Sequence, residues 1–203
     1  MPTIKIQTYA TAASAADAIL KNLQNNALLN SEKDASCKPC GVFDVDETLL
    51  FNRNRDTVEV NEDVFRVYDS LRRAGAHNFV VTARRVTDAS LQYVIDQLKS
   101  VGYNDDPGDD AFQGVYMVNA QHDDDRSASG FKERCRRRVL EKGYKEIAVN
   151  AGDNWSDLTL HPKDFQKRYG GAEGFERSKS YVITGLPHAR LSWKLPNQDY
   201  EVD

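Results

Sequence analysis

Short apolar segments alternate with longer segments of helical periodicity along most of the chain. Residues 11–29 carry Ala, Ile and Leu side chains near helical spacing, which predicts a first helix. A polar loop separates this helix from residues 41–45, an apolar run with the length of a strand. The alternation continues with helices at 61–74, 87–100 and 130–142, and with strands at 78–82, 114–119, 146–150 and 181–184.

This order predicts an α/β fold, in which a parallel sheet is covered by helices on both faces. The chain has 203 residues, enough for one domain with a small addition. We expect residues 41–203 to form the core and residues 1–40 to form an N-terminal helical extension. Because ligands of such sheets bind at the carboxyl ends of the strands, reactive residues should follow the predicted strands.

Two aspartates follow the first predicted strand, in the segment V-F-D-V-D-E-T-L-L. Asp44 and Asp46 are two residues apart, and a turn at the strand end can bring both carboxylates to one ligand. One carboxylate can attack phosphorus while the other donates and accepts protons, so both are candidate catalytic residues. A D-x-D pair is common, and a solvated acidic loop is the alternative interpretation.

The next two segments supply groups that can bind a phosphate. Thr82 and Ala83, in V-V-T-A-R-R, follow the second strand, where the hydroxyl and backbone N–H of Thr82 could bind a phosphate oxygen. A helix N-cap or a packed strand residue is the alternative for Thr82. Lys132 lies near the start of the basic helix, where its charge could neutralise phosphate and nucleophile together, although one lysine alone is more often solvent-exposed.

The fourth segment, V-N-A-G-D-N-W-S-D-L, carries two more aspartates after a strand. Asp153 and Asp157 could complete an oxygen-only magnesium site with Asp44. Phosphoryl transfer needs in-line attack, a metal, and cations around the equatorial oxygens. The residue types for these three requirements occur in order, at or after strand ends, at positions 44, 82, 132 and 153. It is improbable that four such residues fall in these places by chance.

These segments resemble the four motifs of the haloacid dehalogenase (HAD) superfamily. D-V-D-E-T is similar to motif I, the threonine of V-V-T-A-R-R to motif II, Lys132 to motif III, and G-D-N-W-S-D to motif IV. K-E-R-C-R-R-R-V-L-E-K-G-Y, G-D-N-W-S-D-L and W-K-L-P-N-Q-D-Y further resemble the class IIIB acid phosphatases, which include plant vegetative storage proteins. The resemblance covers residues 41–160 and 191–200.

The resemblance implies a Rossmann-like core and a phosphoryl group carried on Asp44. It also implies Mg²⁺ held by the Asp44 carboxylate, the backbone carbonyl of Asp46 and Asp153, with Asp157 beside the metal. The expected function is therefore a Mg²⁺-dependent phosphomonoesterase of the acid-phosphatase type. Some storage proteins of this group lack the nucleophilic aspartate, whereas this chain has both Asp44 and Asp46.

HAD enzymes commonly select substrates with cap domains inserted near the first two motifs. The intervals from Thr48 to Thr82 and from Thr82 to Lys132 are too short for a large cap domain, so we expect an open site. Residues 161–190 look longer than the usual connection to the final strand.

Overall composition limits the partners. The formal charge of −4 and the pI near 5.6 argue against a protein that coats nucleic acid through its overall charge. The arginines of residues 134–138 point in several directions on a helix, and we expect most of them on a solvated face. No stretch approaches the roughly 20 apolar residues that span a bilayer, so no membrane partner is expected, and no signal peptide is visible, which slightly favours the cytoplasm.

The remaining questions stay open at this level. Cys37 and Cys40 form a C-x-x-C without the second ligand pair of a zinc site; ordinary thiols are the simplest interpretation, and a local disulfide or redox role is the alternative. A small phosphate ester is the expected substrate. The alternatives are a phosphatase acting on polynucleotide or protein phosphate ends, and a storage or binding protein with residual phosphatase chemistry. The oligomeric state is not determined.

Overall fold

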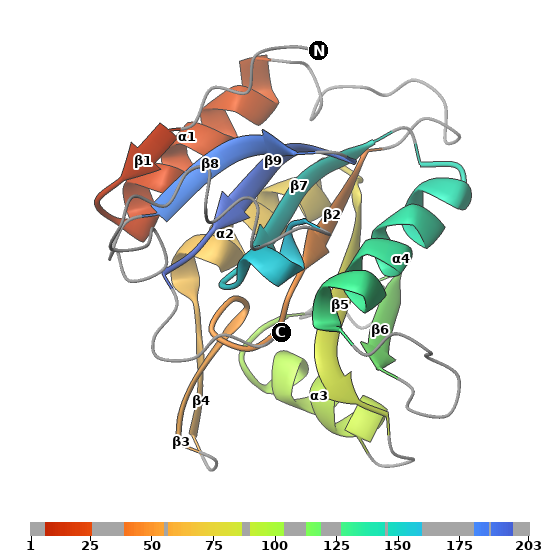
Figure 1. The fold of residues 1–203 in the computed structure, drawn as a ribbon. Coiled ribbons are helices and arrows are strands. Elements are labelled where there is room, and N and C mark those ends of the chain that lie inside the picture. Colours follow the sequence, from red (N-terminus) through yellow and green to blue (C-terminus); the bar gives the residue numbers. More distant parts are fainter. Residues whose placement is uncertain are drawn as a thin grey trace, which may run out of the picture.

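The computed structural model describes residues 7–25, 39–54, 57–86, 90–103, 113–118, 127–144, 146–159, 181–186 and 188–196. Within these residues a seven-stranded sheet has the strand order β1-β8-β9-β7-β2-β5-β6 (Figure 1). Its strands are β1 (Gln7–Tyr9), β2 (Cys40–Phe43), β5 (His77–Arg85), β6 (Gly114–Val118), β7 (Ile147–Gly152), β8 (Tyr181–Leu186) and β9 (Ala189–Lys194). The helices are α1 (Ala12–Asn25), α2 (Glu62–Arg73), α3 (Ser90–Ser100), α4 (Ala128–Glu141) and the single-turn 3-10 helix η2 (Trp155–Asp157).

The centre of the sheet is parallel, as the sequence predicts for an α/β fold. Strand β2 pairs in parallel with β5 and β7, β5 with β6, and β7 with β9. One edge is antiparallel instead, because β8 pairs antiparallel with both β9 and β1. Leu186 pairs with Ala189, and so short a connection can join only antiparallel strands.

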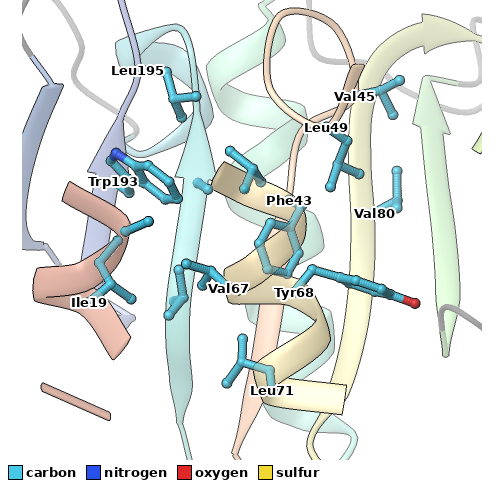
Figure 2. Packing of buried hydrophobic residues seen from close by; sticks show 14 of the residues in the cluster. Ile19, Phe43, Val45, Leu49, Val67, Tyr68, Leu71, Val80, Trp193 and Leu195 are labelled. Carbon is cyan, nitrogen blue, oxygen red and sulfur yellow. The ribbon is translucent and has the colours of Figure 1, made fainter. Parts of the chain in front are cut away.

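Both faces of the sheet are covered, and the alternation of side chains along β2 shows how. Phe43 packs in the cluster that contains buried residues of α1, α2 and α3 (Figure 2). Val42 lies in a second cluster with Phe131 and Val139 of α4. Successive strand residues point to opposite faces, so a strand buried on both faces reads as a continuous apolar run.

The described N-terminal residues take part in this core. Strand β1 pairs with β8 at the edge of the sheet, and Ala15 and Ile19 of α1 are buried in the same cluster as Phe43. Residues 26–38 lie outside the described part of the chain. The domain boundary expected at residue 40 therefore stays a prediction.

The predicted elements occur, with some differences at their ends. The predicted helix at 11–29 is described as far as Asn25, and the predicted strand at 78–82 extends to Arg85 as β5. The antiparallel hairpin of β3 (Leu50–Asn54) and β4 (Thr57–Val60) was not predicted, because polar residues interrupt the alternation in β3. Among the described residues, no helix is long and apolar enough to cross a membrane.

The described elements between the motifs are small. The hairpin and α2 lie between Thr48 and Thr82, and α3 and β6 lie between Thr82 and Lys132. Residues 104–112 and 119–126, in the second interval, fall outside the described residues.

Candidate active site

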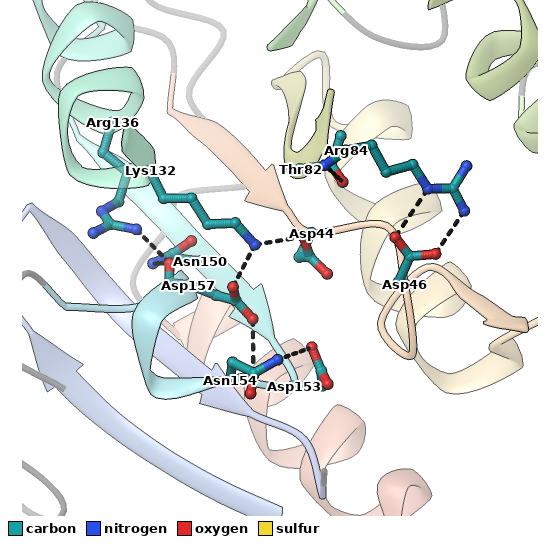
Figure 3. A network of polar contacts seen from close by, with 10 residues as sticks. All are labelled: Asp44, Asp46, Thr82, Arg84, Lys132, Arg136, Asn150, Asp153, Asn154 and Asp157. Atoms are coloured by element: carbon teal, nitrogen blue, oxygen red, sulfur yellow. Dashed lines mark hydrogen bonds and ion pairs between the residues drawn. The ribbon is translucent and has the colours of Figure 1, made fainter. Parts of the chain in front are cut away.

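Three neighbouring parallel strands end at one small cavity. Asp44 follows β2, Thr82 lies near the end of β5, and Asp153 follows β7. A cavity of about 60 Å³ at this point is lined by Asp44, Asp46, Thr82, Ala83, Ala128, Lys132, Asp153, Asn154, Ser156 and Asp157. Every candidate site residue named from the sequence therefore lies in the wall of one cavity. Figure 3 shows all of them except Ala83.

The segment after β2 forms a tight turn that orients its two aspartates. The backbone N–H of Asp44 donates to the carbonyl of Ala151 in β7 at 3.0 Å, which continues the parallel ladder beyond the strand. The carbonyl of Val45 then accepts from two later residues, and Glu47 has a φ of 53°, in the left-handed region that a side chain disfavours. Such strain is typical of functional loops held by their surroundings.

Lys132 lies between two buried carboxylates. Ser127 caps helix α4, accepting from the N–H of Gly130 at 3.2 Å, and the helix brings Lys132 to the cavity. Its ammonium donates to Asp44 Oδ1 at 2.7 Å and to Asp157 Oδ1 (Figure 3). Burial alone would lower the pKa of Lys132, but the charges of Asp157 and Asp44 raise it above its ordinary value, so the lysine stays charged.

The two carboxylates that contact Lys132 form a cluster with a third, that of Asp153. Oxygens of Asp44, Asp153 and Asp157 lie within 4.8 Å of one another, and all three residues are buried. Burial, reinforced by the neighbouring carboxylates, raises the pKa of Asp44 to about 7 and that of Asp153 to about 9. A divalent cation would offset this concentrated negative charge, and an all-oxygen donor set suits Mg²⁺. The carboxylate cluster thus fits the expected metal.

Asp157 is fixed by its backbone and by a glycine. Its carbonyl accepts from Asn150 Nδ2 at 3.2 Å and from Arg136, which is almost fully buried. The N–H of Asn154 donates to Asp157 Oδ2 at 2.8 Å. A Cβ atom at Gly152 would lie 2.2 Å from the Cβ of Asp157, so only glycine leaves room for this side chain.

Asp46 turns toward Arg84 rather than toward the carboxylate cluster. Arg84 Nε donates to Asp46 Oδ2 at 2.9 Å and Arg84 Nη2 donates to Asp46 Oδ1 at 2.6 Å (Figure 3). The register of β5 against β6 skips the residues between Thr82 and Arg85, and such a bulge re-aims side chains. The carboxylate of Asp46 is absent from the described metal cluster, and a metal contact through its backbone carbonyl stays a prediction.

Two residues beside the site were not identified from the sequence. These residues are Arg84 and Lys194. Lys194 is buried, and its ammonium lies 5.9 Å from the ring centre of Trp155. Burial raises the pKa of Asp153, and the charge of Lys194 partly opposes that rise. The sequence signal for both was weak, since Arg84 stands next to a second arginine and Lys194 belongs to a strand.

Other expectations are corrected in part. The basic helix does not present all its arginines to solvent, because Arg136 is buried and ion-paired with Glu133, whereas Arg137 and Arg138 are exposed. Burial also raises the pKa of the Cys40 thiol to about 12, which makes this cysteine a poor nucleophile; Cys37 lies outside the described residues.

Comparison with known proteins assigns the chain to a family. The family described as HAD superfamily, subfamily IIIB (acid phosphatase), matches residues 53–203. The chain belongs to this family. It is accordingly a phosphatase, a phosphoric monoester hydrolase. The matched range includes Thr82, Lys132, Asp153 and Asp157 but begins after Asp44 and Asp46, whose roles therefore rest on geometry. A search of the curated proteins found no match.

Proposed function

We propose that this phosphatase hydrolyses small phosphate monoesters with Mg²⁺, through an aspartyl-phosphate intermediate on Asp44. The observation that carries the proposal is the contact of the buried Asp44 carboxylate with Lys132 Nζ at 2.7 Å, at the carboxyl end of β2. The ammonium favours the ionised, nucleophilic form of Asp44 and would offset the charge of an incoming phosphate. Asp44 lines the cavity, and its second oxygen, Oδ2, would attack phosphorus.

Asp44, Asp153 and Asp157 are the residues that would hold the metal. When bound, Mg²⁺ would neutralise charge on the phosphate oxygens and favour the ionised form of Asp44. A bound metal would account for three buried carboxylates lying so close together around Lys132. Asp157 also fixes Lys132, so its side chain serves both the metal cluster and the phosphate-binding cation.

Thr82 and Ala83 would bind the transferred phosphoryl group. The hydroxyl oxygen of Thr82 accepts from the N–H of Arg84 at 3.2 Å, so its own hydrogen is available to donate to a phosphate oxygen. Ala83 lines the same cavity, on the segment of β5 that the register with β6 skips. Lys132 and Thr82 thereby supply donors from two different elements to the equatorial oxygens.

Asp46 would act first as the acid and then as the base. It lines the same cavity as Asp44. In the first step its carboxyl protonates the leaving oxygen, and in the second it accepts a proton from the water that attacks the aspartyl-phosphate.

Small esters fit this site better than polynucleotide or protein phosphate ends. The cavity of about 60 Å³ has room for a phosphate group, and the rest of the substrate would stay outside it. The basic helix offers no continuous charged face, since Arg136 points inward. The storage or binding alternative is disfavoured because Asp44 and Asp46 are both present at the cavity.

The test combines turnover with chemical labelling. The wild type should hydrolyse an aryl phosphate, lose activity in EDTA and recover with Mg²⁺, and quenched enzyme should carry base-labile phosphate on Asp44. Asp44→Asn should abolish both turnover and label. Asp17→Asn makes the same chemical change at an exposed ion pair on α1, where we expect no effect. Label on a serine or histidine, or full activity after chelation, would refute the mechanism.

A further inference from the structure

A chain of side chains connects the proposed general base to helix α3. Arg84 pairs with both oxygens of Asp46, and its third nitrogen, Nη1, donates to Gln97 Oε1 at 2.6 Å. Gln97 Nε2 in turn donates to the hydroxyl of Tyr93 at 2.8 Å. The path therefore runs from the cavity wall to the solvent face of α3.

The amide of Gln97 is held at both ends. A guanidinium only donates, so the amide oxygen must face Arg84 and the amide nitrogen must face Tyr93. Asp46 and Arg84 keep side-chain exposures of 30% and 22%. The pair is therefore partly exposed, and a long arginine side chain loses rotamer freedom when it is held in one geometry. Gln97 supplies the second anchor that restricts Arg84.

The pairing suits Asp46 as a base. Each carboxylate oxygen has two acceptor positions, and the fork of Arg84 occupies one on each. A planar, bidentate contact sets the plane of the carboxylate, and that plane decides how the carboxylate oxygens face the attacking water.

We propose that Gln97 is a positioning residue for the second half of the reaction, which rests on the proposed function. In that step a water oxygen bonds to phosphorus, the bond between phosphorus and the Asp44 oxygen breaks, and the water proton passes to an oxygen of Asp46. Asp44 is released as a carboxylate together with inorganic phosphate. Gln97 holds Arg84, and Arg84 holds Asp46 in the orientation that receives this proton.

The expected signature is kinetic. With an activated aryl phosphate the first step needs little protonation, so Gln97→Leu should slow only hydrolysis of the phospho-enzyme. With a substrate for which hydrolysis of the phospho-enzyme limits turnover, kcat and KM should fall together by about tenfold, the order expected for a lost hydrogen bond to a charged group, while kcat/KM stays unchanged. Phospho-enzyme should accumulate in the steady state. Loss of correctly folded enzyme would instead lower kcat at constant KM.

Two variants control for the substitution. Gln92→Leu makes the same change on the same helix and should behave as wild type, because the Gln92 amide donates to Asp96 and is not the acceptor of the Arg84 bond. Gln97→Glu keeps an oxygen acceptor for Arg84 and should restore most of the rate. An unchanged kcat in Gln97→Leu, or a fall in kcat without a fall in KM, would overturn the proposal.

A second measurement separates this inference from the proposed function. The Nε–H of Arg84 is bonded to Asp46, so its NMR signal should exchange slowly with water in the wild type and in Gln92→Leu. Exchange should become faster in Gln97→Leu. Equal protection in both variants would show that Gln97 does not hold Arg84, whatever the activity. A wild type without any turnover of phosphate esters would overturn the proposed function and, with it, the kinetic role of Gln97.

Discussion

Replacing Gly152 by alanine would place a methyl group against the side chain of Asp157. The new Cβ would lie 2.2 Å from Asp157 Cβ and 2.4 Å from Asp157 Oδ2. Carbon atoms in contact are about 3.5 Å apart, so Asp157 or the strand must move by about 1.3 Å. The strand cannot easily retreat, because Gly152 pairs with Lys194 and its carbonyl accepts from the N–H of Leu195 at 2.9 Å.

The displacement would fall on Asp157, which contacts Lys132 and the N–H of Asn154. Overpacking of this kind costs about 1–3 kcal/mol of stability, and a misplacement of about 1 Å at a catalytic group can cost about 100-fold in rate. We therefore expect a modest fall in Tm, a large loss of kcat/KM with an aryl phosphate, and a higher Mg²⁺ concentration for half-maximal activity.

The matched control is Gly185→Ala in β8, where the nearest atom to the new methyl group would be a backbone oxygen at 3.5 Å, an ordinary contact. Thermal unfolding, steady-state kinetics and Mg²⁺ titration should be measured on both variants. If Gly152→Ala proves indistinguishable from Gly185→Ala in all three, Asp157 does not lie against Gly152 as the structure has it, or its position does not matter to catalysis.

Two more predictions concern the carboxylates. Asp46→Asn should slow the phosphorylation step of an alkyl phosphate far more than that of an aryl phosphate, and equal losses in presteady-state bursts would move the acid role elsewhere. In EDTA, the free energy of unfolding should fall as the pH rises, because burial raises the pKa of Asp44 to about 7 and of Asp153 to about 9. The unfolded values lie near about 4, so the folded state binds more protons between about pH 4 and 9. Mg²⁺ should flatten this dependence, and a metal-free stability that rises with pH in denaturant titrations would contradict the sign.

Much of the fold could be predicted because its signals are local. The apolar run that ends in Phe43 is buried on both faces, and such runs alternating with amphipathic helices require a parallel sheet. The hairpin of β3 and β4 was missed since its strands are short and polar residues interrupt them. The antiparallel pairing of β1 with β8 was also missed, because it joins residues far apart in the chain.

The sequence by itself determined which residues reach the cavity. Asp44, Thr82 and Asp153 each stand at the end of a central strand, and neighbouring parallel strands present those ends to one place whatever their side chains do next. Only the tertiary structure decided their partners. Arg84 and Arg85 are adjacent and of the same residue type, yet Arg84 faces Asp46 and Arg85 is exposed. The pairing of β5 with β6 is irregular at this point, because it skips the residues between Thr82 and Arg85. The direction of a side chain and its contacts depend on backbone irregularities and on helices from other parts of the chain. No local pattern of residues predicts them.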